Sequence, residues 1–320
     1  MTYLIGDIGG TNTRLALADA SGLQGASLRH FENARFASFY DVLTQYLTSF
    51  DAPRITSTCL AIAGPVHETP PRLTNLNWEF DEGPIKEMTG AQSLVLVNDL
   101  AALSHALPEL SQSQSLTRLG GPQPVAASGQ SLVVGIGTGF NVSLSKQLAD
   151  GTTMAFEAEM GHAQLPQAAL DLLRAHLGEQ ATGSRHVEHW LSGAGLERIY
   201  TELSHNHLPG RDIMSRFEGG TDSHATAAVT LFARVLGLLC REMICQYMPR
   251  AGLVFAGSVA RSLLTSRGLD LFSDSFLSGP PTVTELSNIP CLLIADDAAA
   301  LQGCLQILLD QKALQAQRGS

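Results

Sequence analysis

The sequence predicts an α/β protein built on largely parallel sheets, and two observations indicate this class. Short apolar runs typical of buried strands, at residues 58–63 and 93–97, are separated by segments of helical period. A strand, a glycine turn and a returning strand occur twice, with the turns at residues 9–10 and 135–139. Strands separated by helices pair in parallel, whereas strands joined by a tight turn pair antiparallel. We therefore expect mixed sheets in two related halves.

In the first half, the hydrophobic pattern changes from strand to helix at Ser38. Apolar side chains recur at helical spacing from residue 39 onward, and serine is favoured as the residue that caps a helix N-terminus. The expected strands are residues 2–6, 13–19, 28–34, 58–63 and 93–97, and the expected helices are 39–50 and 81–88.

A change of composition divides the chain. Residues 108–130 are rich in Ser, Gln, Gly and Pro and lose the hydrophobic period, so we expect a domain junction there. The apolar segment 298–309 has helical spacing and is expected to pack on the first domain. The expected domains are a small N-terminal α/β domain, 1–108 plus 298–320, and a large α/β domain, 109–297. In the large domain the expected strands are 131–134, 141–145, 253–256 and 291–295, and the expected helices are 168–177, 185–191, 196–203 and 224–247.

Composition narrows the classes of partner. The 320 residues carry 30 acidic and 20 basic side chains, a net charge of −10. Nucleic-acid binding and attachment to an anionic membrane both need a basic surface, so both are disfavoured. Only three lysines are present and none follows a glycine, so the phosphate loop G-x-x-x-x-G-K-[ST] is absent, as is any G-x-G-x-x-G run. Any nucleotide must be held in another way.

We expect a cytoplasmic protein. The first ten residues include Asp7 and no positive charge, unlike a secretory signal, and the apolar stretch 225–240 is too short for a bilayer and contains Arg234. Cysteines without a C-x-x-C pair, mostly in apolar surroundings, are typical of core thiols in a reducing compartment. They are Cys59, Cys240, Cys245, Cys291 and Cys304.

The first candidate site is the glycine turn within residues 6–14. Gly9 and Gly10 permit positive φ and expose backbone N–H groups, which forms an anion-binding concavity without lysine. Thr11 and Asn12 could add donors, and Asp7 could hold a water of a magnesium ion. An ordinary hairpin turn is the alternative. The second turn, around Thr138 and Gly139, favours the phosphate interpretation.

The second candidate is Asn98-Asp99, which follows the strand 93–97. Ligands of open α/β sheets bind beyond the carboxyl ends of strands. A carboxylate there could accept a proton from a substrate hydroxyl, and the amide could orient the substrate. Both residue types are also favoured as helix N-caps, so one of the pair could do only that.

The third candidate combines Glu159, His162 and Glu188, whose carboxylates and imidazole could bind polyol hydroxyls. Glu-x-x-His is also a di-iron repeat, but that site needs a second repeat and further glutamates, which the chain lacks. His186 and His189 could face a metal together, but no third ligand is evident, and solvated histidines are favoured. The strand 253–256 runs into a small-residue turn, which could admit a flat ring or simply join strand to helix.

The ordered set of motifs resembles the bacterial glucokinase family, within the actin/hexokinase/ribonuclease H-like superfamily. The motifs cover nearly the whole chain in family order, and their order and spacing together are specific. They are GDIGGTN (6–12), AIAGP (61–65), LTNLNW (73–78), VNDL (97–100), GIGTG (135–139), EMGH (159–162), EHWLSGAG (188–195) and VFAG (254–257).

The resemblance implies two ribonuclease H-like (actin-like ATPase) domains with mixed sheets flanked by helices around a central cleft. It implies ATP-dependent phosphorylation of D-glucose at the 6-hydroxyl, with Mg²⁺, by a homodimer. Asp99 would be the catalytic base; Asn98, Asp99, Glu159, His162 and Glu188 would bind glucose. ATP would be held by Gly6, Asp7, Ile8, Gly9, Gly10, Thr11, Thr138, Gly139 and Gly257, with Asp7 reaching the metal through water.

Three positions depart from the family pattern. Met160 and Asn141 each stand where glycine is customary, and Ser258 replaces a glycine of the adenosine motif. Methionine is strained if position 160 needs positive φ, whereas asparagine tolerates that conformation better. The added Cβ of Ser258 could crowd the nucleotide.

Other functions remain open at this point. A kinase for another hexose or an amino sugar would fit the altered sugar loop. A non-catalytic sugar-sensing regulator would need a DNA-binding element, for which no room is expected before the first strand. A filament-forming actin relative is disfavoured by the full set of sugar-binding matches.

Overall fold

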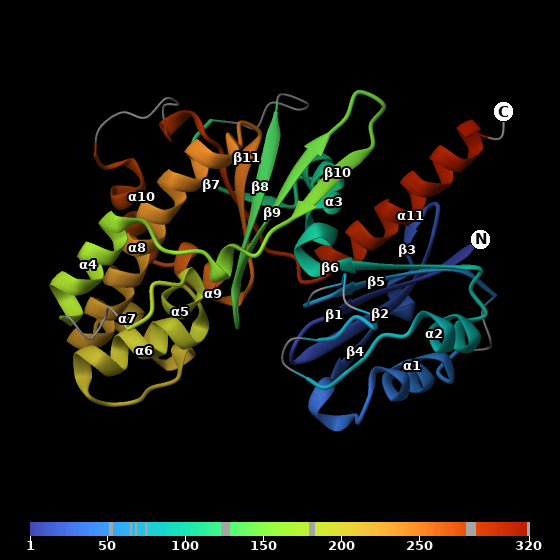
Figure 1. Cartoon of the computed structure of the whole chain (residues 1–320), viewed down its shortest axis with the longest axis horizontal. Coiled ribbons are helices and arrows are strands. Elements are labelled where there is room, and N and C mark those ends of the chain that lie inside the picture. Colours follow the sequence, from blue (N-terminus) through green and yellow to red (C-terminus); the bar gives the residue numbers. More distant parts are fainter. Residues whose placement is uncertain are drawn as a thin grey trace. The chain divides into compact units, whose positions relative to one another are not determined.

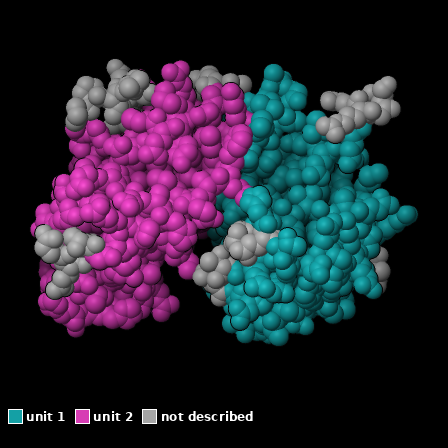
Figure 2. All heavy atoms as spheres, in the orientation of Figure 1, with its two compact units in different colours: residues 1–114, 147–155, 296–320 teal, residues 115–146, 156–295 magenta. Residues whose placement is uncertain are grey.

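The computed structural model describes residues 1–50, 54–64, 66–67, 69–73, 76–122, 129–178, 183–279 and 286–318. The chain forms two compact units, shown in teal and magenta in Figure 2. Unit 1 comprises Met1–Gln114, Gln147–Ala155 and Asp296–Ser320, and unit 2 comprises Ser115–Lys146 and Phe156–Ala295. Residues of one unit contact mainly one another. The domain boundaries expected from the sequence stay a prediction.

The sheet of unit 1 is mixed and has the strand order β3-β2-β1-β5-β6, with β4 also paired to β2. The first two long strands form the expected antiparallel hairpin, whereas β1, β5 and β6 run parallel to one another. The strands are β1 (Thr2–Ile8), β2 (Asn12–Asp19), β3 (Gly22–Leu23), β4 (Arg29–Glu32), β5 (Ile55–Ile62) and β6 (Ser93–Asn98).

Both faces of this sheet are covered, because apolar side chains of β1 alternate between two cores. Leu4 and Ile8 pack toward α1 (Phe39–Leu47) and α2 (Glu82–Thr89), and Tyr3 and Ile5 pack toward α11 (Ala299–Arg318). The helix α3 (Asp99–Gln112) packs along α11 (Figure 1). Helix α1 begins where the sequence predicted, with Ser38 and Asp41 forming a capping box.

The second sheet repeats this plan in the order β10-β9-β8-β11-β12-β7, and all of it except Gln147 of β9 and residues 153–155 of β10 belongs to unit 2. Strands β8 and β9 form an antiparallel hairpin, β8, β11 and β12 are parallel, and β7 closes the edge antiparallel to β12. The strands are β7 (Leu116–Gly120), β8 (Gln130–Ile136), β9 (Phe140–Gln147), β10 (Thr153–Glu157), β11 (Gly252–Ala256) and β12 (Cys291–Ile294).

A long central helix organises the core of unit 2. Helix α8 (Ser223–Tyr247) contacts four other helices and carries a wide apolar face. Gly237 lets α10 approach closely, because a Cβ there would be 2.8 Å from the backbone nitrogen of Phe276. The other helices are α4 (Gln167–Leu177), α5 (Val187–Trp190), α6 (Gly193–Ser204), α7 (Gly210–Gly219), α9 (Ser258–Leu264) and α10 (Gly268–Leu277).

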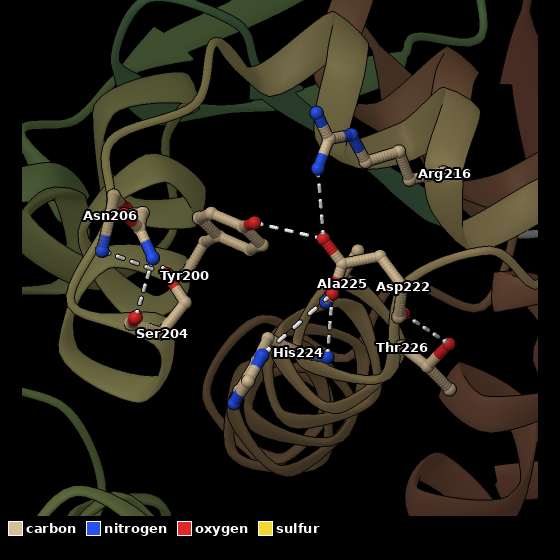
Figure 3. Close-up of polar contacts among 8 residues, drawn as sticks. All are labelled: Tyr200, Ser204, Asn206, Arg216, Asp222, His224, Ala225 and Thr226. Atoms are coloured by element: carbon tan, nitrogen blue, oxygen red, sulfur yellow. Dashed lines mark hydrogen bonds and ion pairs between the residues drawn. The ribbon is translucent and has the colours of Figure 1, made fainter.

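Asp222 caps the N-terminus of α8 and ties it to two neighbouring helices (Figure 3). Its Oδ1 accepts from the backbone of His224 and Ala225, at 2.8 and 3.1 Å. Its Oδ2 accepts from the Tyr200 hydroxyl at 2.8 Å and from Arg216 Nη1 at 3.2 Å. These hydrogen bonds, that of Tyr200 first, lower the pKa of Asp222 to about 2. The carboxylate therefore contributes as an anion.

The stretch 108–130, where a domain junction is expected, contains the division between the two units after Gln114, but part of it is regular structure: Pro108 lies inside α3, and β7 follows. A proline removes only one helical hydrogen bond, and packing of α3 on α11 outweighs that loss. The strand expected at 28–34 corresponds to β4, which ends at Glu32 because residues Asn33–Arg35 form a 3₁₀ turn. The sequence patterns also missed β3, β10, α7 and α10.

No helix among the described residues has both the length and the apolar character needed to cross a membrane.

Candidate active site

The glycine turn of unit 1 joins β1 to β2. The Gly9 N–H donates to the Asn12 carbonyl at 2.9 Å and closes the turn. Neither Gly9 nor Gly10 has positive φ, so the turn does not use the conformation that glycine permits there. Among the described residues, the N–H groups of Gly10 and Thr11 have no acceptor, which leaves both available to an anion.

Asn33 holds this turn in place through hydrogen bonds, and the sequence patterns did not single it out. Its Nδ2 donates to the Gly9 carbonyl at 2.8 Å, its backbone N–H donates to the Thr11 carbonyl at 2.9 Å, and its Oδ1 accepts from the Thr13 hydroxyl. Asn33 is buried, although asparagine is usually exposed. The signal available in the sequence was an asparagine near the end of the expected strand 28–34.

Gly6 and Ile8 lie within β1 rather than on the turn. A Cβ on Gly6 would be 2.7 Å from Leu60 Cδ2 and 2.8 Å from Leu15 Cδ2, so glycine at this position makes room for core packing. Ile8 is buried in the same core. Gly6 and Ile8 therefore contribute to the packing of β1, the strand that precedes the turn.

Asp7 lies just before the turn and is paired with Arg14, whose Nη1 donates to Asp7 Oδ2 at 3.0 Å. Asp297 is 3.8 Å from the other Arg14 nitrogen. Burial raises the pKa of Asp7 above its ordinary value, and Arg14 offsets only part of that shift. Arg14 bonds Asp7 Oδ2, so Asp7 Oδ1 can accept a hydrogen bond from a water molecule bound to Mg²⁺.

Asn98 and Asp99 lie at the junction of β6 and α3. Asn98 is the N-cap: its Oδ1 accepts from Leu100 and Ala101, and its Nδ2 donates toward the Gly64 carbonyl at 3.5 Å. Asp99 is the first helical residue, and its Oδ1 accepts from the Leu100 N–H at 2.9 Å. The capping alternative therefore applies to Asn98, and Asp99 is half-buried at the positive end of the helix dipole.

The strand register brings these two sets of residues to one edge of the unit 1 sheet. Ile8 pairs with Ile62 across β1 and β5, and Ile62 pairs with Asn98 across β5 and β6. All three strands are parallel, so their carboxyl ends meet at the same edge. The glycine turn and Asp99 therefore emerge on the side where α/β sheets bind ligands.

In unit 2, the second glycine turn joins β8 to β9, and Thr138 is exposed on it. The Phe140 N–H donates to Glu188 Oε2 at 2.9 Å. A Cβ on Gly139 would be 2.4 Å from that same oxygen, so glycine leaves space for the carboxylate. Gly257 has φ 95° and approaches the Ile136 carbonyl so closely that a side chain would overlap it.

Glu159 precedes the 3₁₀ turn Met160–His162, which ends at His162 and contacts α5. The His162 carbonyl accepts from His186 Nδ1 at 2.7 Å, which fixes the proton of His186 on Nδ1. Burial first, and then the charge of Arg198, lowers the pKa of His189. Both effects favour neutral imidazole at this site.

A pocket of about 310 Å³ opens among these residues, all of them in unit 2. It brings together three of the predicted residues, Thr138, His162 and Glu188; Glu159 is not in its wall. The wall also contains residues that the patterns did not assign to the site: Gly161, Ser184, Ser192, Ala194 and Arg198, together with His186 and His189. Hydroxyls, imidazoles and a carboxylate suit a ligand rich in hydroxyl groups.

Within the described ranges, no three His, Cys, Asp or Glu side chains group as a metal site. Neither Met160 nor Asn141 has positive φ, so the strain considered for position 160 is absent. Met160 is buried in the core of unit 2. Ser258 begins α9, and it is the preceding Gly257 that adopts the unusual φ.

The chain is similar in sequence to proteins of known family. The family model described as Glucokinase matches residues 4–311. A glucokinase from Nitrobacter hamburgensis is 32% identical and covers 96% of this chain and 97% of its own. A glucokinase from Saccharophagus degradans is 28% identical, with 94% and 96% covered.

Solved structures agree in fold. The glucokinase of an Antarctic psychrotroph has a TM-score of 0.79 at 25% identity, covering 97% of this chain and 99% of that one. A ROK family glucokinase from Streptomyces griseus, in complex with glucose and AMPPNP, has a TM-score of 0.62 at 15% identity, covering 96% and 99%. The protein thus has the actin-like ATPase fold of the sugar kinases, as predicted. The chain belongs to the glucokinase family, which confirms the resemblance seen in its motifs.

Proposed function

We propose that this chain transfers the γ-phosphoryl group of ATP to the 6-hydroxyl of glucose, with Asp99 as the general base. The observation that carries the proposal is the register of β1, β5 and β6, by which Asp99 and the Gly9–Thr11 turn share one edge of a sheet. Family membership supports the reaction class. The Streptomyces griseus structure supports the substrates, because it holds glucose and an ATP analogue.

Asp99 performs the proton transfer in this mechanism. Its carboxylate accepts the proton of the 6-hydroxyl as O6 bonds to the γ-phosphorus and the bond to the β-phosphate oxygen breaks, which releases ADP. A positioned base of this kind accelerates a reaction by about 10²–10⁴-fold. The Leu100 N–H donates to Asp99 Oδ1 at 2.9 Å, which orients the carboxylate at the start of α3.

The other residues bind and orient. Asn98, Glu159, His162 and Glu188 form hydrogen bonds to sugar hydroxyls, and fixing the sugar replaces a bimolecular encounter. The N–H groups of Gly10 and Thr11, with Thr138 and Gly139 in the second turn, bind phosphate oxygens. The small-residue turn at Gly257 admits the adenosine.

Asp7 would hold a water of Mg²⁺. When bound, the metal neutralises the charge of the outer phosphates. Burial raises the pKa of Asp7, and a bound dication would offset this by stabilising the ionised carboxylate.

The test is ADP release by the purified protein with ATP, Mg²⁺ and a panel of hexoses and amino sugars. We expect kcat/KM for glucose to exceed that for every other sugar. A higher kcat/KM for another hexose or an amino sugar would identify that sugar as the substrate in place of glucose. Absence of turnover on every sugar would overturn the proposal.

Two further assignments rest on the resemblance. Family members are typically homodimers, and light scattering tests this state for the present chain. We also expect a cytoplasmic location, because the cytoplasm supplies ATP and keeps cysteines reduced, and all five cysteines are free thiols in the structure. Imaging of the tagged chain in cells tests this location.

A further inference from the structure

Asn141 links two parts of the candidate sugar site that are far apart in sequence. It lies near the start of β9, and its side-chain amide faces the turn that begins at Glu159. Its Oδ1 accepts from the Met160 N–H and from the Val142 N–H, both at 2.9 Å. Its Nδ2 donates to Glu159 Oε2 at 3.3 Å. All four residues belong to unit 2.

The orientation of this amide is fixed by its partners. Two backbone donors converge on one side-chain atom, which must therefore be the oxygen, because an NH₂ group cannot accept. The NH₂ group then points toward Glu159. The carboxylate of Glu159 receives a neutral donor on one oxygen and keeps its remaining lone pairs as acceptors.

Asn141 and Met160 are two of the positions that depart from the family pattern, and here they are bonded to each other. The Met160 side chain is anchored in the core of unit 2, whereas Glu159 is exposed. An exposed glutamate samples several rotamers, so an unsupported carboxylate would be poorly ordered. In this chain the Asn141 amide supplies that support.

We propose that Asn141 is a positioning residue that holds the Glu159 carboxylate ready for a sugar hydroxyl. The assignment rests on the proposed function, because it presumes that Glu159 binds the sugar. Asn141 touches neither the reacting hydroxyl nor the phosphates in this assignment. Its loss should therefore weaken sugar binding while leaving phosphoryl transfer from the bound state largely intact.

The sharpest test is Asn141→Asp, which has nearly the same shape. Its Oδ1 can still accept from Met160 and Val142, but the group that faces Glu159 becomes an anion instead of a donor. We expect KM for glucose to rise at least tenfold at pH 8, with kcat within threefold of wild type and KM for ATP unchanged. The rise should shrink as pH falls, because the pair of carboxylates then shares a proton.

The control is Asn206→Asp, at an exposed asparagine of unit 2 whose Nδ2 donates to a backbone carbonyl, that of Ser204, at 2.8 Å. It should leave KM for glucose unchanged at every pH. Asn141→Gly removes all three hydrogen bonds and adds no charge. It should raise KM for glucose several-fold without the pH dependence, and it keeps the test available if Asn141→Asp does not fold.

Titration calorimetry with glucose alone gives a second readout, the Kd, which should change in parallel with KM. An unchanged Kd and KM in folded Asn141→Asp, or a loss confined to Tm and kcat, would overturn the assignment. A wild-type chain that binds glucose but phosphorylates no sugar would overturn the proposed function and leave the Kd test of Asn141 valid. A wild-type chain that binds no sugar would overturn both.

Discussion

Gly303 on α11 lies against Ala102 on α3 so closely that a Cβ at position 303 would be 1.8 Å from the Ala102 carbonyl oxygen. Helix α3 carries Asp99 at its N-terminus. The close packing of α3 on α11 therefore helps to position α3 against the sheet of unit 1. It thereby also positions Asp99, the proposed base.

Replacing Gly303 with alanine should separate these helices. Overpacking against backbone atoms cannot be relieved by a rotamer change, so we expect the free energy of unfolding to fall by about 1–3 kcal/mol or more. Urea denaturation measures it. Gly210→Ala in α7 is the control, because a Cβ there meets only ordinary contacts, at 3.7 Å and beyond, and alanine favours helix. Equal losses in both variants would contradict the explanation.

Asp99→Asn should remove the proton acceptor and preserve the local structure, since an amide oxygen can still accept from Leu100. We expect kcat to fall by about 10²–10⁴-fold, with the Kd for glucose close to wild type. Stopped assays for ADP and calorimetry for glucose measure the two quantities. Turnover comparable to wild type would exclude Asp99 as the base.

Gly139→Ala should displace the Glu188 carboxylate, because the added Cβ would be 2.4 Å from Oε2. That atom ends a flexible side chain, so the fold should tolerate the change. Loss of a hydrogen bond to a charged group is worth about 1.5–3 kcal/mol, and we expect KM for glucose to rise about tenfold or more. Thermal melting checks the fold, and an unchanged KM would show that Glu188 does not contact the sugar.

Asp7→Asn should raise the Tm at pH 7 while abolishing most activity. Burial raises the pKa of Asp7, so ionisation of this group opposes folding above that pKa, and an amide avoids the cost. The gain in Tm should shrink as pH falls through the raised pKa, where wild-type Asp7 becomes protonated in the folded state. Melting curves between pH 4 and pH 8 measure it. A gain that is the same at every pH would refute the explanation.

Asp222→Asn should lower the Tm at pH 7, because an NH₂ group cannot accept from Tyr200 and Arg216. The pKa of Asp222 is lowered to about 2 in the folded chain, against 3.8 ordinarily. Its stabilisation is therefore complete above the ordinary pKa and lost as pH falls toward 2. The difference in Tm between wild type and variant should decrease over that interval.

Tyr200→Phe is the companion variant for this prediction. It removes the hydrogen bond that lowers the pKa of Asp222 most, so that pKa should move back toward its ordinary value. The pH interval in which stability is lost should then shift upward. If the interval stays where it is in wild type, the hydroxyl of Tyr200 is not the cause.

Local patterns predicted the elements that depend on neighbours in sequence. Alternation in residues 13–19, helical spacing after Ser38 and the two glycine turns all correspond to observed elements. The continuation of α3 through Pro108 was not predicted, because the packing of α3 on α11, some 200 residues away in the chain, determines whether a helix can continue through that proline.

The sequence by itself determined the family, the glycine turns and the candidate residues, because motif order and residue chemistry can be compared position by position. Only the tertiary structure decided that Asn33 holds the first turn, that Gly139 makes room for Glu188, and that Asn141 reaches Glu159. Each of these relationships joins segments distant in the chain. They depend on strand register and on the close packing of backbones, which no local pattern of residues specifies.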